Sequence, residues 1–392
     1  MMRISSGKIL MNKKKLVFLT GTRADFGKLK SLISISQKSN DYEVHIFATG
    51  MHLNSVYGST IDEIKKSQFE NIYPFINHDA IGSMDKALAK TIDGFSHFIA
   101  EINPDLIIVH GDRVEALAGA LVGSLNNILV AHIEGGEVSG TIDGLIRHAV
   151  SKMSHIHFVA NQEARLRLIQ LGESSKSIFI LGSPDMDLMN SATLPTQRKV
   201  LQYYNIDFTN YCIAMFHPVT TEYNDTKSNV KIFVDALLDS NDNYIVIYPN
   251  NDLGSTYILE EYERLKGNSR FKIFPSLRFE YFLVLLKSAQ YIIGNSSAGI
   301  REAPFYNIPT IDIGSRQNNR AKDISIVHAA NSYDAIVKSI SLAKGLELFE
   351  GNEKHNFGHG HSDTLFLNLL NGNQIWSSDC QKQFQDIPYE EN

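Results

Sequence analysis

Cysteine is nearly absent from this chain, which has only Cys212 and Cys380 among its 392 residues. Two cysteines cannot build the disulfide framework of a small secreted protein, nor a metal centre held by several thiolates. We therefore expect a fold that depends on its hydrophobic core and not on disulfides, and no metal site built on thiolates.

Long hydrophobic runs are also lacking. No stretch approaches the roughly 20 apolar residues that span a bilayer. The first residues, MMRISSGKILMNKKK, lack the apolar segment of roughly 7–15 residues that a signal peptide contains. These absences predict a cytoplasmic protein with no membrane partner, in which residues 1–14 form a flexible leader.

An excess of positive charge is missing as well. The formal net charge is −6 at pH 7, with 37 lysines and arginines against 43 aspartates and glutamates. Proteins that bind nucleic acids or membrane surfaces carry basic patches, so we expect neither partner. A small anionic ligand is still compatible with this charge, because a few local arginines are enough to hold one.

Short apolar runs alternate with helix-length segments along most of the chain. Such runs are typical of buried parallel strands in βαβ units, and 392 residues exceed the about 250–300 that one hydrophobic core supports. We therefore predict an α/β protein of two Rossmann-like, doubly wound domains that face each other across a cleft. The predicted strands are 15–20, 42–48, 105–109, 128–132, 156–159 and 178–181 in the first half, and 212–216, 244–248, 271–274, 290–293 and 308–312 in the second.

The connection between the domains is expected in the polar, irregular segment 186–208, which follows the break at Gly182-Ser183-Pro184. This assigns residues 15–186 to the N-terminal domain and 187–361 to the C-terminal domain. Residues 362–392 are typical of a helix and a polar tail, with the only tryptophan at Trp376. We expect this last segment to pack back on the N-terminal domain.

Charged side chains follow two neighbouring predicted strands. The first apolar run stops at HGDR, residues 110–113, and the next stops at HIEGGE, residues 132–137. Ligands of open α/β sheets bind outside the carboxyl ends of the strands, and glycines let the backbone turn sharply there. The two strand ends therefore bring Asp112, Glu134, His132 and an arginine to one rim, a set suited to proton transfer and anion binding.

A predicted helix after Gly140-Thr141 carries Asp143, Arg147 and His148. Asp143 and Arg147 are four residues apart, so they share one face of the helix. The alternative to a role in the site is an exposed ion pair, which contributes about a few tenths of a kcal/mol.

The first strand is followed by GTRADFG, residues 21–27. We expect a turn there and a helix over 28–37. A strand, a glycine turn and a helix start form an anion site, because unpaired N–H groups point outward. The pattern is not G-x-G-x-x-G, so the dinucleotide fingerprint is absent. An ordinary turn in which Asp25 caps the helix is the alternative.

The second half contains GNSSAGIRE, residues 294–302, after a predicted strand. Small and hydroxyl-bearing residues at a helix start let a phosphate approach backbone N–H groups. Glu302 lies a little over one turn further on, where its carboxylate can accept hydrogen bonds from two ribose hydroxyls. The alternative is a serine cap and a surface glutamate. His217, Asn250 and Arg316 follow further predicted strands. The alternative for a histidine or asparagine at a strand end is a turn former or a polar group satisfied within the protein.

The histidines His355, His359 and His361 lie close together in HNFGHGHS. Three histidines so close in sequence could together bind a metal ion. The glycines of this segment favour instead a loop that contacts a nucleotide or is exposed to solvent.

Several motifs together resemble the hydrolysing UDP-N-acetylglucosamine 2-epimerases of sialic-acid biosynthesis, over residues 15 to 376. The most specific are H-G-D-R-x-E-A-L at 110–117 and H-I-E-G-G-E-V-S-G-T-I-D at 132–143. Non-hydrolysing 2-epimerases are similar in fold but have H-G-D-T and H-x-E-A-G at these places. The further matches are T-R-A-D at 22–25, H-P-V-T-T at 217–221, G-N-S-S-x-G-x-R-E at 294–302 and G-x-R-Q at 314–317.

This resemblance implies the glycosyltransferase-B arrangement of two domains, a UDP-sugar in the cleft, a homodimer, and no metal or nicotinamide cofactor. It also implies anti elimination of UDP from UDP-GlcNAc to 2-acetamidoglucal, followed by hydration to N-acetylmannosamine. The implied UDP contacts are Arg23, Arg113, His217, Asn250, Ser296, Ser297, Glu302 and Arg316. The implied proton-transfer residues are Asp112, Glu134 and Asp143, surrounded by His132, Arg147 and Glu137.

Two departures from the family and three rival functions accompany the resemblance. Gly27 stands where many relatives have a small polar residue, and the segment 357–360 reads F-G-H-G in place of Y-G-D-G. One rival is the same chemistry on UDP-2,4-diacetamido-2,4,6-trideoxyglucose, toward legionaminic acid. The others are a UDP-sugar glycosyltransferase of the same fold and a nucleotide-sugar-binding protein without catalysis.

Overall fold

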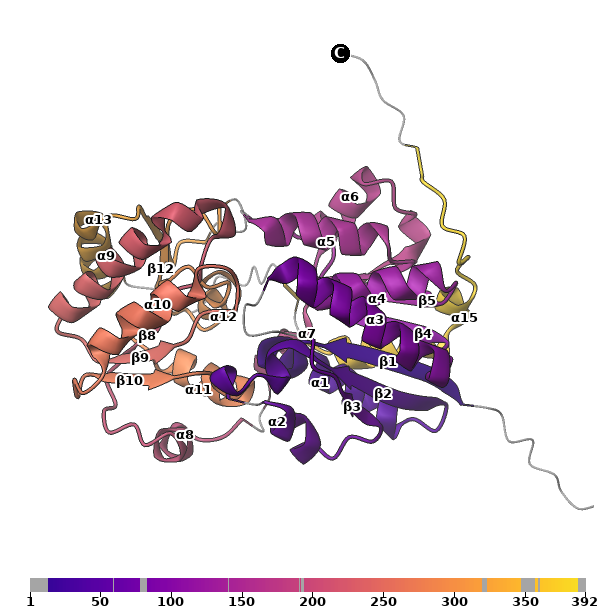
Figure 1. The fold of residues 1–392 in the computed structure, drawn as a ribbon, viewed down its shortest axis with the longest axis horizontal. Helices are drawn as coiled ribbons and strands as arrows, with labels where there is room; N and C mark the ends of the chain where they lie inside the picture. Colours follow the sequence, from indigo (N-terminus) through magenta and orange to yellow (C-terminus); the bar gives the residue numbers. More distant parts are fainter. Residues whose placement is uncertain are drawn as a thin grey trace, which may run out of the picture.

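The computed structural model consists of two lobes, each built on one parallel sheet with helices packed against it (Figure 1). The predicted α/β class with two sheets is confirmed. The structure describes residues 13–58, 60–77, 83–139, 141–189, 191, 194–318, 323–346, 357–358 and 360–386.

The N-terminal sheet has seven parallel strands in the order β3-β2-β1-β4-β5-β6-β7. The order reverses between β1 and β4, and this reversal is where open α/β sheets bind ligands. The strands are β1 (Lys14–Thr20), β2 (Tyr42–Ala48), β3 (Ile72–Pro74), β4 (Leu106–His110), β5 (Leu129–Ile133), β6 (Ile156–Val159) and β7 (Ile178–Ile180).

The C-terminal sheet has six parallel strands in the order β10-β9-β8-β11-β12-β13, so its order reverses between β8 and β11. The two reversals place the carboxyl ends of β1, β4, β8 and β11 where a ligand between the lobes would contact them. The strands are β8 (Cys212–Met215), β9 (Tyr244–Ile247), β10 (Phe271–Phe274), β11 (Ile292–Gly294), β12 (Thr310–Ile313) and β13 (Ile326–Ala329).

Helices follow most strands, as βαβ units require. In the N-terminal lobe they are α1 (Arg23–Lys38), α2 (Ile61–Lys66), α3 (Met84–Ile102), α4 (Val114–Leu125), α5 (Ile142–Lys152) and α6 (Gln162–Gln170). In the rest of the chain they are α7 (Pro184–Met189), α8 (Gln197–Tyr203), α9 (Thr226–Asp239), α10 (Ser255–Tyr262), α11 (Phe279–Lys287), α12 (Ala298–Phe305), α13 (Tyr333–Lys344), α14 (Ser362–Asn371) and α15 (Asn373–Trp376). Short 3-10 helices lie at Gly50–Leu53, Ser55–Tyr57, Ser175–Ser177, Thr220–Asp225 and Glu263–Leu265.

Helix α1 begins earlier than the sequence indicates. It starts at Arg23 and not at residue 28, because Thr22 caps it: the Thr22 side chain accepts a hydrogen bond from the Asp25 N–H at 3.2 Å. Asp25 in turn accepts from the N–H of Gly21 at 2.9 Å and from that of Thr22. The predicted turn over residues 21–27 was therefore wrong beyond Thr22, and the cap is Thr22 with Asp25 as its reciprocal partner.

The segment 186–208 is also more regular than predicted. It contains most of α7 and all of α8; α7 packs against α1, and α8 packs against α11. The connection between the sheets is therefore anchored to both lobes. The prediction of irregular structure was wrong because each of these helices is only six or seven residues long.

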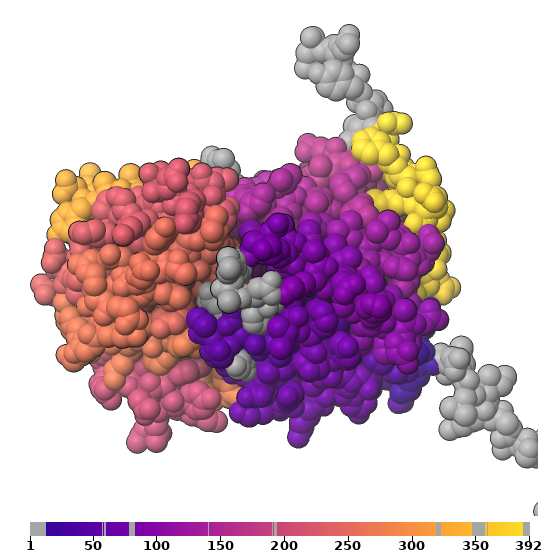
Figure 2. Space-filling model, in the orientation of Figure 1, coloured from indigo at the N-terminus to yellow at the C-terminus, as the bar shows by residue number. Residues whose placement is uncertain are grey.

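The last described helices return to the N-terminal lobe. Phe366 and Leu370 of α14 are fully buried beside Leu16 and Phe18 of β1, with the rings of Phe18 and Phe366 6.3 Å apart. In Figure 2 the yellow segment near the end of the chain runs along the magenta N-terminal lobe. Among the described residues, none of the helices combines the length and the apolar character that crossing a bilayer requires.

Candidate functional site

A cavity of about 180 Å³ lies between the lobes, and we call it the interdomain pocket. Its walls include the apolar side chains of Ile247, Leu277 and Phe282. Most of the residues to which the resemblance assigns UDP contacts line it: Arg23, His217, Asn250, Ser296, Ser297 and Glu302. Arg113 and Arg316 are not among its lining residues and form ion pairs between the lobes.

Asn295 joins the loops that follow β8 and β11. Its side chain accepts a hydrogen bond from the His217 N–H at 2.6 Å and donates one to the His217 carbonyl at 2.9 Å. Arg316 and Gln317, which follow β12, donate to the Asn295 carbonyl at 3.2 and 2.9 Å. The loops after three neighbouring strands therefore form one connected floor for the pocket.

His217 is held as a neutral donor. Burial, and then the nearby guanidinium groups of Arg316 and Arg113, lower the pKa of His217 well below its usual value. Its Nδ1 accepts a hydrogen bond from the Asn250 N–H at 3.0 Å. The neutral ring therefore carries its proton on Nε2, where it can donate to an anionic ligand.

Glu302 is a buried carboxyl group of α12 that lines the interdomain pocket. Burial, together with the negative charges of Asp185 and Glu134, raises the pKa of Glu302, although Lys28 opposes the shift. The Lys28 Nζ lies 3.8 Å from Oε1. The other oxygen, Oε2, is buried with no hydrogen-bond partner among the described residues, so it is ready to pair with a ligand hydroxyl.

Glu134 follows β5 in a left-handed conformation, with φ of 65°. This conformation costs a residue with a side chain about 1–2 kcal/mol, so strong contacts must hold it. Its Oε1 accepts hydrogen bonds from Ser183 at 2.6 Å and from Arg301 at 2.5 Å. The Nε2 of His110 lies 3.4 Å from its Oε2.

The charges around Glu134 keep it ionised. Burial alone would raise the pKa of Glu134, but Arg301, Lys28 and His110 outweigh it and hold the pKa well below its usual value. The Lys28 ammonium is 3.6 Å from the carboxylate. Glu134 is therefore an anion at neutral pH, suited to stabilising a positive charge.

Asp112 is more open than Glu134: its side chain is 22% exposed, against 4% for Glu134. Arg147, fully buried in α5, pairs with Asp112 and donates to Glu137 at 3.0 Å and to the Glu134 carbonyl at 3.4 Å. Arg147 thus fixes the loops after β4 and β5 relative to each other.

His132 lies behind these loops. Its Nε2 donates to the Gly111 carbonyl at 2.8 Å, and its Nδ1 is 3.0 Å from the Ser151 hydroxyl. Burial lowers the pKa of His132 to about 3. With both ring nitrogens engaged inside the protein, His132 positions the backbone of Gly111, next to Asp112.

Asp143 faces the other lobe. Its carboxylate pairs with Arg316 at 3.0 Å. Burial raises the pKa of Asp143, and the negative charges of Asp112 and Asp252 add to the effect while Arg316 opposes it. Of the carboxylates expected to transfer protons, Asp143 is thus pushed toward its protonated form and Glu134 away from it.

Further ion pairs join the lobes beside the pocket. Arg113 donates to Asp252 at 3.1 Å and to the side chain of Asn251 at 2.8 Å. Arg301 of α12 lies 2.7 Å from a Glu137 oxygen. Arginines assigned to a ligand are therefore held by carboxylates from the opposite lobe.

Four polar or charged residues of the site were assigned no role from the sequence: Lys28, Ser183, Asp185 and Arg301. Ser183 and Asp185 directly follow the strand β7, so the rule that placed Glu134 at the rim applies to them too. In the sequence, Ser183 is part of the break at Gly182-Ser183-Pro184, and neither Ser183 nor Asp185 was predicted to belong to the site. Lys28 gave no comparable signal, and Arg301 stood out only as part of the motif at 294–302, because both lie inside helices and their partners are distant in sequence.

The segment before α14 covers Arg301. The Arg301 guanidinium lies 4.5 Å from the centre of the Phe357 ring, and the Ser183 N–H donates to the Phe357 carbonyl at 2.6 Å. His355 and His359 lie outside the described residues, and His361 is exposed just before α14. Within the described ranges, no group of three or more His, Cys, Asp or Glu residues is arranged to hold a metal ion.

Residues 35–371 match the family described as UDP-N-acetylglucosamine 2-epimerase. The chain is 47% identical over 379 residues to UDP-N-acetylglucosamine 2-epimerase of Neisseria meningitidis serogroup B, covering 95% of this chain and 99% of the relative. It is 35% identical to UDP-N,N'-diacetylbacillosamine 2-epimerase (hydrolyzing) of Legionella pneumophila, covering 84% and 89%.

The fold also matches a solved structure, Methanocaldococcus jannaschii UDP-GlcNAc 2-epimerase in complex with UDP-GlcNAc and UDP. The TM-score is 0.78 at 22% identity, over 91% of this chain and 99% of the other. The predicted glycosyltransferase-B arrangement is thereby confirmed. Since the family match spans most of the chain and a relative of nearly full length shares almost half of its residues, the chain belongs to the UDP-N-acetylglucosamine 2-epimerase family.

Proposed function

We propose that this protein is a hydrolysing UDP-GlcNAc 2-epimerase, which converts UDP-GlcNAc and water to N-acetylmannosamine and UDP. One observation carries the proposal: Lys28, which lines the interdomain pocket, lies 3.6 Å from Glu134. Glu134, Asp112 and Asp143 follow neighbouring strands or begin the next helix of the N-terminal lobe. A nucleotide held at the C-terminal sheet would place its sugar against these carboxylates.

Departure of UDP places negative charge on the pyrophosphate, which arginines stabilise in a site of low dielectric. Arg113 and Arg316 are among the arginines to which the resemblance assigns UDP contacts, and both are paired with carboxylates, Asp252 and Asp143. The pyrophosphate of a UDP-sugar carries two negative charges, against the one of a carboxylate, and forms charge-assisted hydrogen bonds with guanidinium groups. We therefore expect substrate to replace Asp143 on Arg316, and so to free Asp143 for proton transfer.

Inversion at C2 requires that a proton leave from one face of the sugar and return on the other. In this proposal the exposed carboxylate of Asp112 takes the C2 proton as UDP departs, and the anionic Glu134 stabilises the positive charge at C1. Asp143, with its raised pKa, then donates a proton to C2 of the glucal. Water adds at C1 and returns its proton to Asp143, and Asp112 releases its own proton to solvent.

The test is proton NMR of the products formed from UDP-GlcNAc in D₂O. The expected products are UDP and N-acetylmannosamine with deuterium at C2, because the returning proton comes from a group that exchanges with solvent. N-acetylmannosamine is the amino sugar from which sialic acids are built, so such an enzyme would supply that pathway. A product that keeps the C2 hydrogen, or UDP-ManNAc as the stable end product, would reject this mechanism.

A second candidate substrate is UDP-N,N'-diacetylbacillosamine, the 2,4-diacetamido-2,4,6-trideoxy sugar nucleotide. The 35% identity to the Legionella pneumophila enzyme named for it favours this candidate. The 47% identical relative favours UDP-GlcNAc. Both nucleotides should be offered together at equal concentration; we expect UDP-GlcNAc to be consumed first, and the opposite order would reassign the substrate.

Two expectations remain: a homodimer, which the resemblance implies, and a cytoplasmic location, which the sequence predicts. Sedimentation velocity of the purified protein tests the dimer, since two copies of a 43.9 kDa chain are well separated from one. A single monomeric species at micromolar concentration would contradict it.

A further inference from the structure

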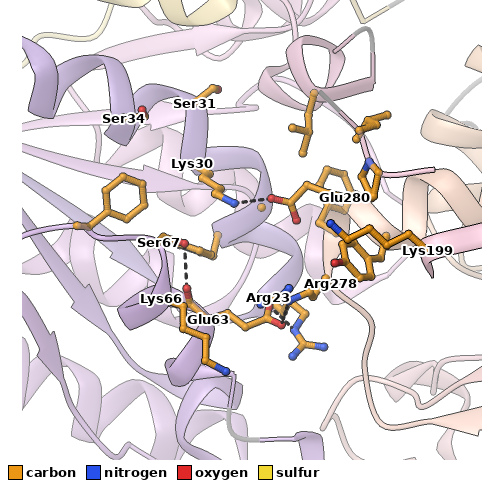
Figure 3. Close-up of a pocket in the computed structure, with 18 residues that line it drawn as sticks. Arg23, Lys30, Ser31, Ser34, Glu63, Lys66, Ser67, Lys199, Arg278 and Glu280 are labelled. Atoms are coloured by element: carbon orange, nitrogen blue, oxygen red, sulfur yellow. Dashed lines mark hydrogen bonds and ion pairs between the residues drawn. The ribbon is translucent and has the colours of Figure 1, made fainter. Parts of the chain in front are cut away.

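A second, larger cavity of about 590 Å³ lies between α1, α2, α8 and α11, and we call it the α1–α11 cavity (Figure 3). Both lobes contribute to its wall, with Lys30 and Lys66 from one and Lys199 and Arg278 from the other. Arg23 and Phe279 line both this cavity and the interdomain pocket, so the two spaces share a wall. The mechanism proposed above makes no use of this cavity.

The α1–α11 cavity has an excess of positive charge. Five basic side chains line it against two carboxylates, although the whole chain carries a net charge of −6. Figure 3 shows Glu63 between Arg23 and Arg278, at 2.9 Å from each, and Lys30 meeting Glu280 at 2.5 Å. The two carboxylates are thus already occupied by basic partners.

The two remaining lysines of this cavity are not held by a carboxylate of the described residues. Lys66 and Lys199 are exposed and have no ion-pair partner among the described residues. They come from opposite lobes, so an anion between them would connect α2 of the N-terminal lobe with α8. The cavity is therefore suited to a ligand that carries a phosphate or a carboxylate.

The rest of the wall is suited to a sugar. The buried hydroxyl of Ser31 has no hydrogen-bond partner among the described residues, which is unusual for a buried polar atom. Ser34 lines the cavity next to it, and the aromatic side chains of Phe69 and Tyr281 line other parts. Hydroxyls bond to a polyol, and aromatic surface packs on its C–H groups.

We propose that the α1–α11 cavity binds a small polyhydroxylated anion, a sugar phosphate or a sugar carboxylate, and that this anion opposes nucleotide binding through Arg23. The Arg23 guanidinium lies in the wall between the two sites and pairs with Glu63. An anion in the cavity draws Arg23 to that side, whereas a pyrophosphate draws it to the other. Coupling between two binding sites is reciprocal, so each ligand lowers the affinity of the protein for the other by the same factor.

The test is calorimetry on the full chain with glucose 6-phosphate, glucuronate and, as the uncharged control, glucose. We expect at least one of the anions to bind and glucose to show no binding. Which of the two anions binds shows whether the cavity takes a sugar phosphate or a sugar carboxylate. Saturation with UDP should lower the affinity for that anion by about 5-fold or more, which is the lower end of known coupling factors. Equal binding of glucose, or no effect of UDP, would overturn the proposal.

A pair of variants locates the site. The double variant Lys66→Gln/Lys199→Gln removes the two unpaired cations. We expect it to lower the affinity for the anion by about 10-fold or more, because hydrogen bonds to charged groups are lost. Lys65→Gln/Lys338→Gln removes the same charge from exposed lysines outside the cavity wall and should leave anion binding unchanged. An equal effect of both double variants would place the anion elsewhere.

The two double variants also separate this proposal from the proposed function. UDP affinity without added anion, and the C2-deuterated product, should be the same in both variants as in the parent protein. If the parent protein does not catalyse the epimerase reaction, the proposed function is rejected. The anion titration still tests the proposal for the α1–α11 cavity in that case.

Discussion

Asp112 and Glu134 end neighbouring strands but have different surroundings. Glu134 is enclosed by Lys28, Arg301 and His110, which lower its pKa. Asp112 pairs with the buried Arg147 and remains partly exposed. A tightly held anion stabilises charge, whereas an accessible carboxylate can move toward a substrate. We therefore expect different chemical roles from two residues of similar type.

Replacement of Asp112 by asparagine should lower turnover of UDP-GlcNAc by about 100-fold or more, the scale of general acid–base catalysis. The amide keeps the size of the side chain but cannot take a proton. UDP affinity should remain nearly the same. The measurement is steady-state UDP release together with calorimetry.

The matched control is Glu137→Gln, because Glu137 pairs with the same Arg147 at 3.0 Å. If Asp112 only balances the charge of Arg147, both variants will lose turnover equally. The Asp112→Asn variant should still hydrate 2-acetamidoglucal, since the role proposed for Asp112 lies in the elimination. Failure of that hydration would move Asp112 to the second half-reaction.

Replacement of Glu302 by alanine should make the binding free energy of UDP less favourable by about 1–3 kcal/mol, the range for a lost hydrogen bond to a charged group. The reason is the partnerless Oε2 in the pocket wall, which we assign to the ribose. Calorimetry with UDP and with 2'-deoxy-UDP separates the contacts. The loss should be smaller for the deoxy nucleotide, and an equal loss for both would show that Glu302 does not contact the 2'-hydroxyl.

At the scale of elements, helix α1 approaches α11 of the other lobe more closely than a side chain allows. A Cβ placed on Gly27 would lie 2.6 Å from the Phe279 Cβ. Phe279 fills the space that a side chain at position 27 would need. The pair therefore sets the distance between two helices that line the interdomain pocket and the α1–α11 cavity.

The Gly27→Ala variant should lower the melting temperature. Overpacking costs about 1–3 kcal/mol, which exceeds the about 0.5–1 kcal/mol gained when alanine replaces glycine in a helix. The control is Gly345→Ala at the end of α13, where the nearest atom to an added Cβ is 3.6 Å away. A higher melting temperature for Gly27→Ala would mean that the lobes separate easily.

Central strands and their polar ends could be predicted from sequence, because a strand buried on both faces must be apolar throughout. Edge strands β3 and β13 were missed, since they have only three and four residues and part of each is exposed. The rim with Asp112 and Glu134 followed from topology alone. Arg301 did not, because its partner Glu134 lies 167 residues away on another lobe.

At the scale of the whole molecule, the tail after α15 is bound to the N-terminal lobe. Lys382 donates to the carbonyls of Ser151, Lys152 and Ser154, and its ammonium lies 2.5 Å from Glu173. Glu173 also accepts a hydrogen bond from His157 at 3.0 Å. One buried carboxylate therefore joins the sheet, α5 and the tail.

Glu173 should make stability depend on pH. Burial alone would raise its pKa, but His157, Lys382 and Lys152 lower the pKa to about 2, against an ordinary value of 4.5. A lowered carboxyl pKa stabilises the fold above pH 4.5, and this stabilisation is lost as the pH falls from 4.5 toward 2. Glu173→Gln should therefore lose about 1–3 kcal/mol at pH 7 and less at pH 3.

Urea unfolding at pH 7 and pH 3 measures this difference. The control is Glu163→Gln, an exposed carboxylate that pairs with Arg167 on α6 and should change stability by less than about 0.5 kcal/mol. The same loss for Glu173→Gln at both pH values would show that its packing matters and its charge does not.

The burial of Phe366 against Phe18 has a consequence for synthesis on the ribosome. Domains made first usually fold first, while the rest of the chain is still being translated. Here the sheet that begins at Lys14 cannot close its hydrophobic core until α14 has emerged, well after every strand of the C-terminal sheet. The lobe translated second can therefore finish folding before the lobe translated first, which must wait with an apolar surface uncovered.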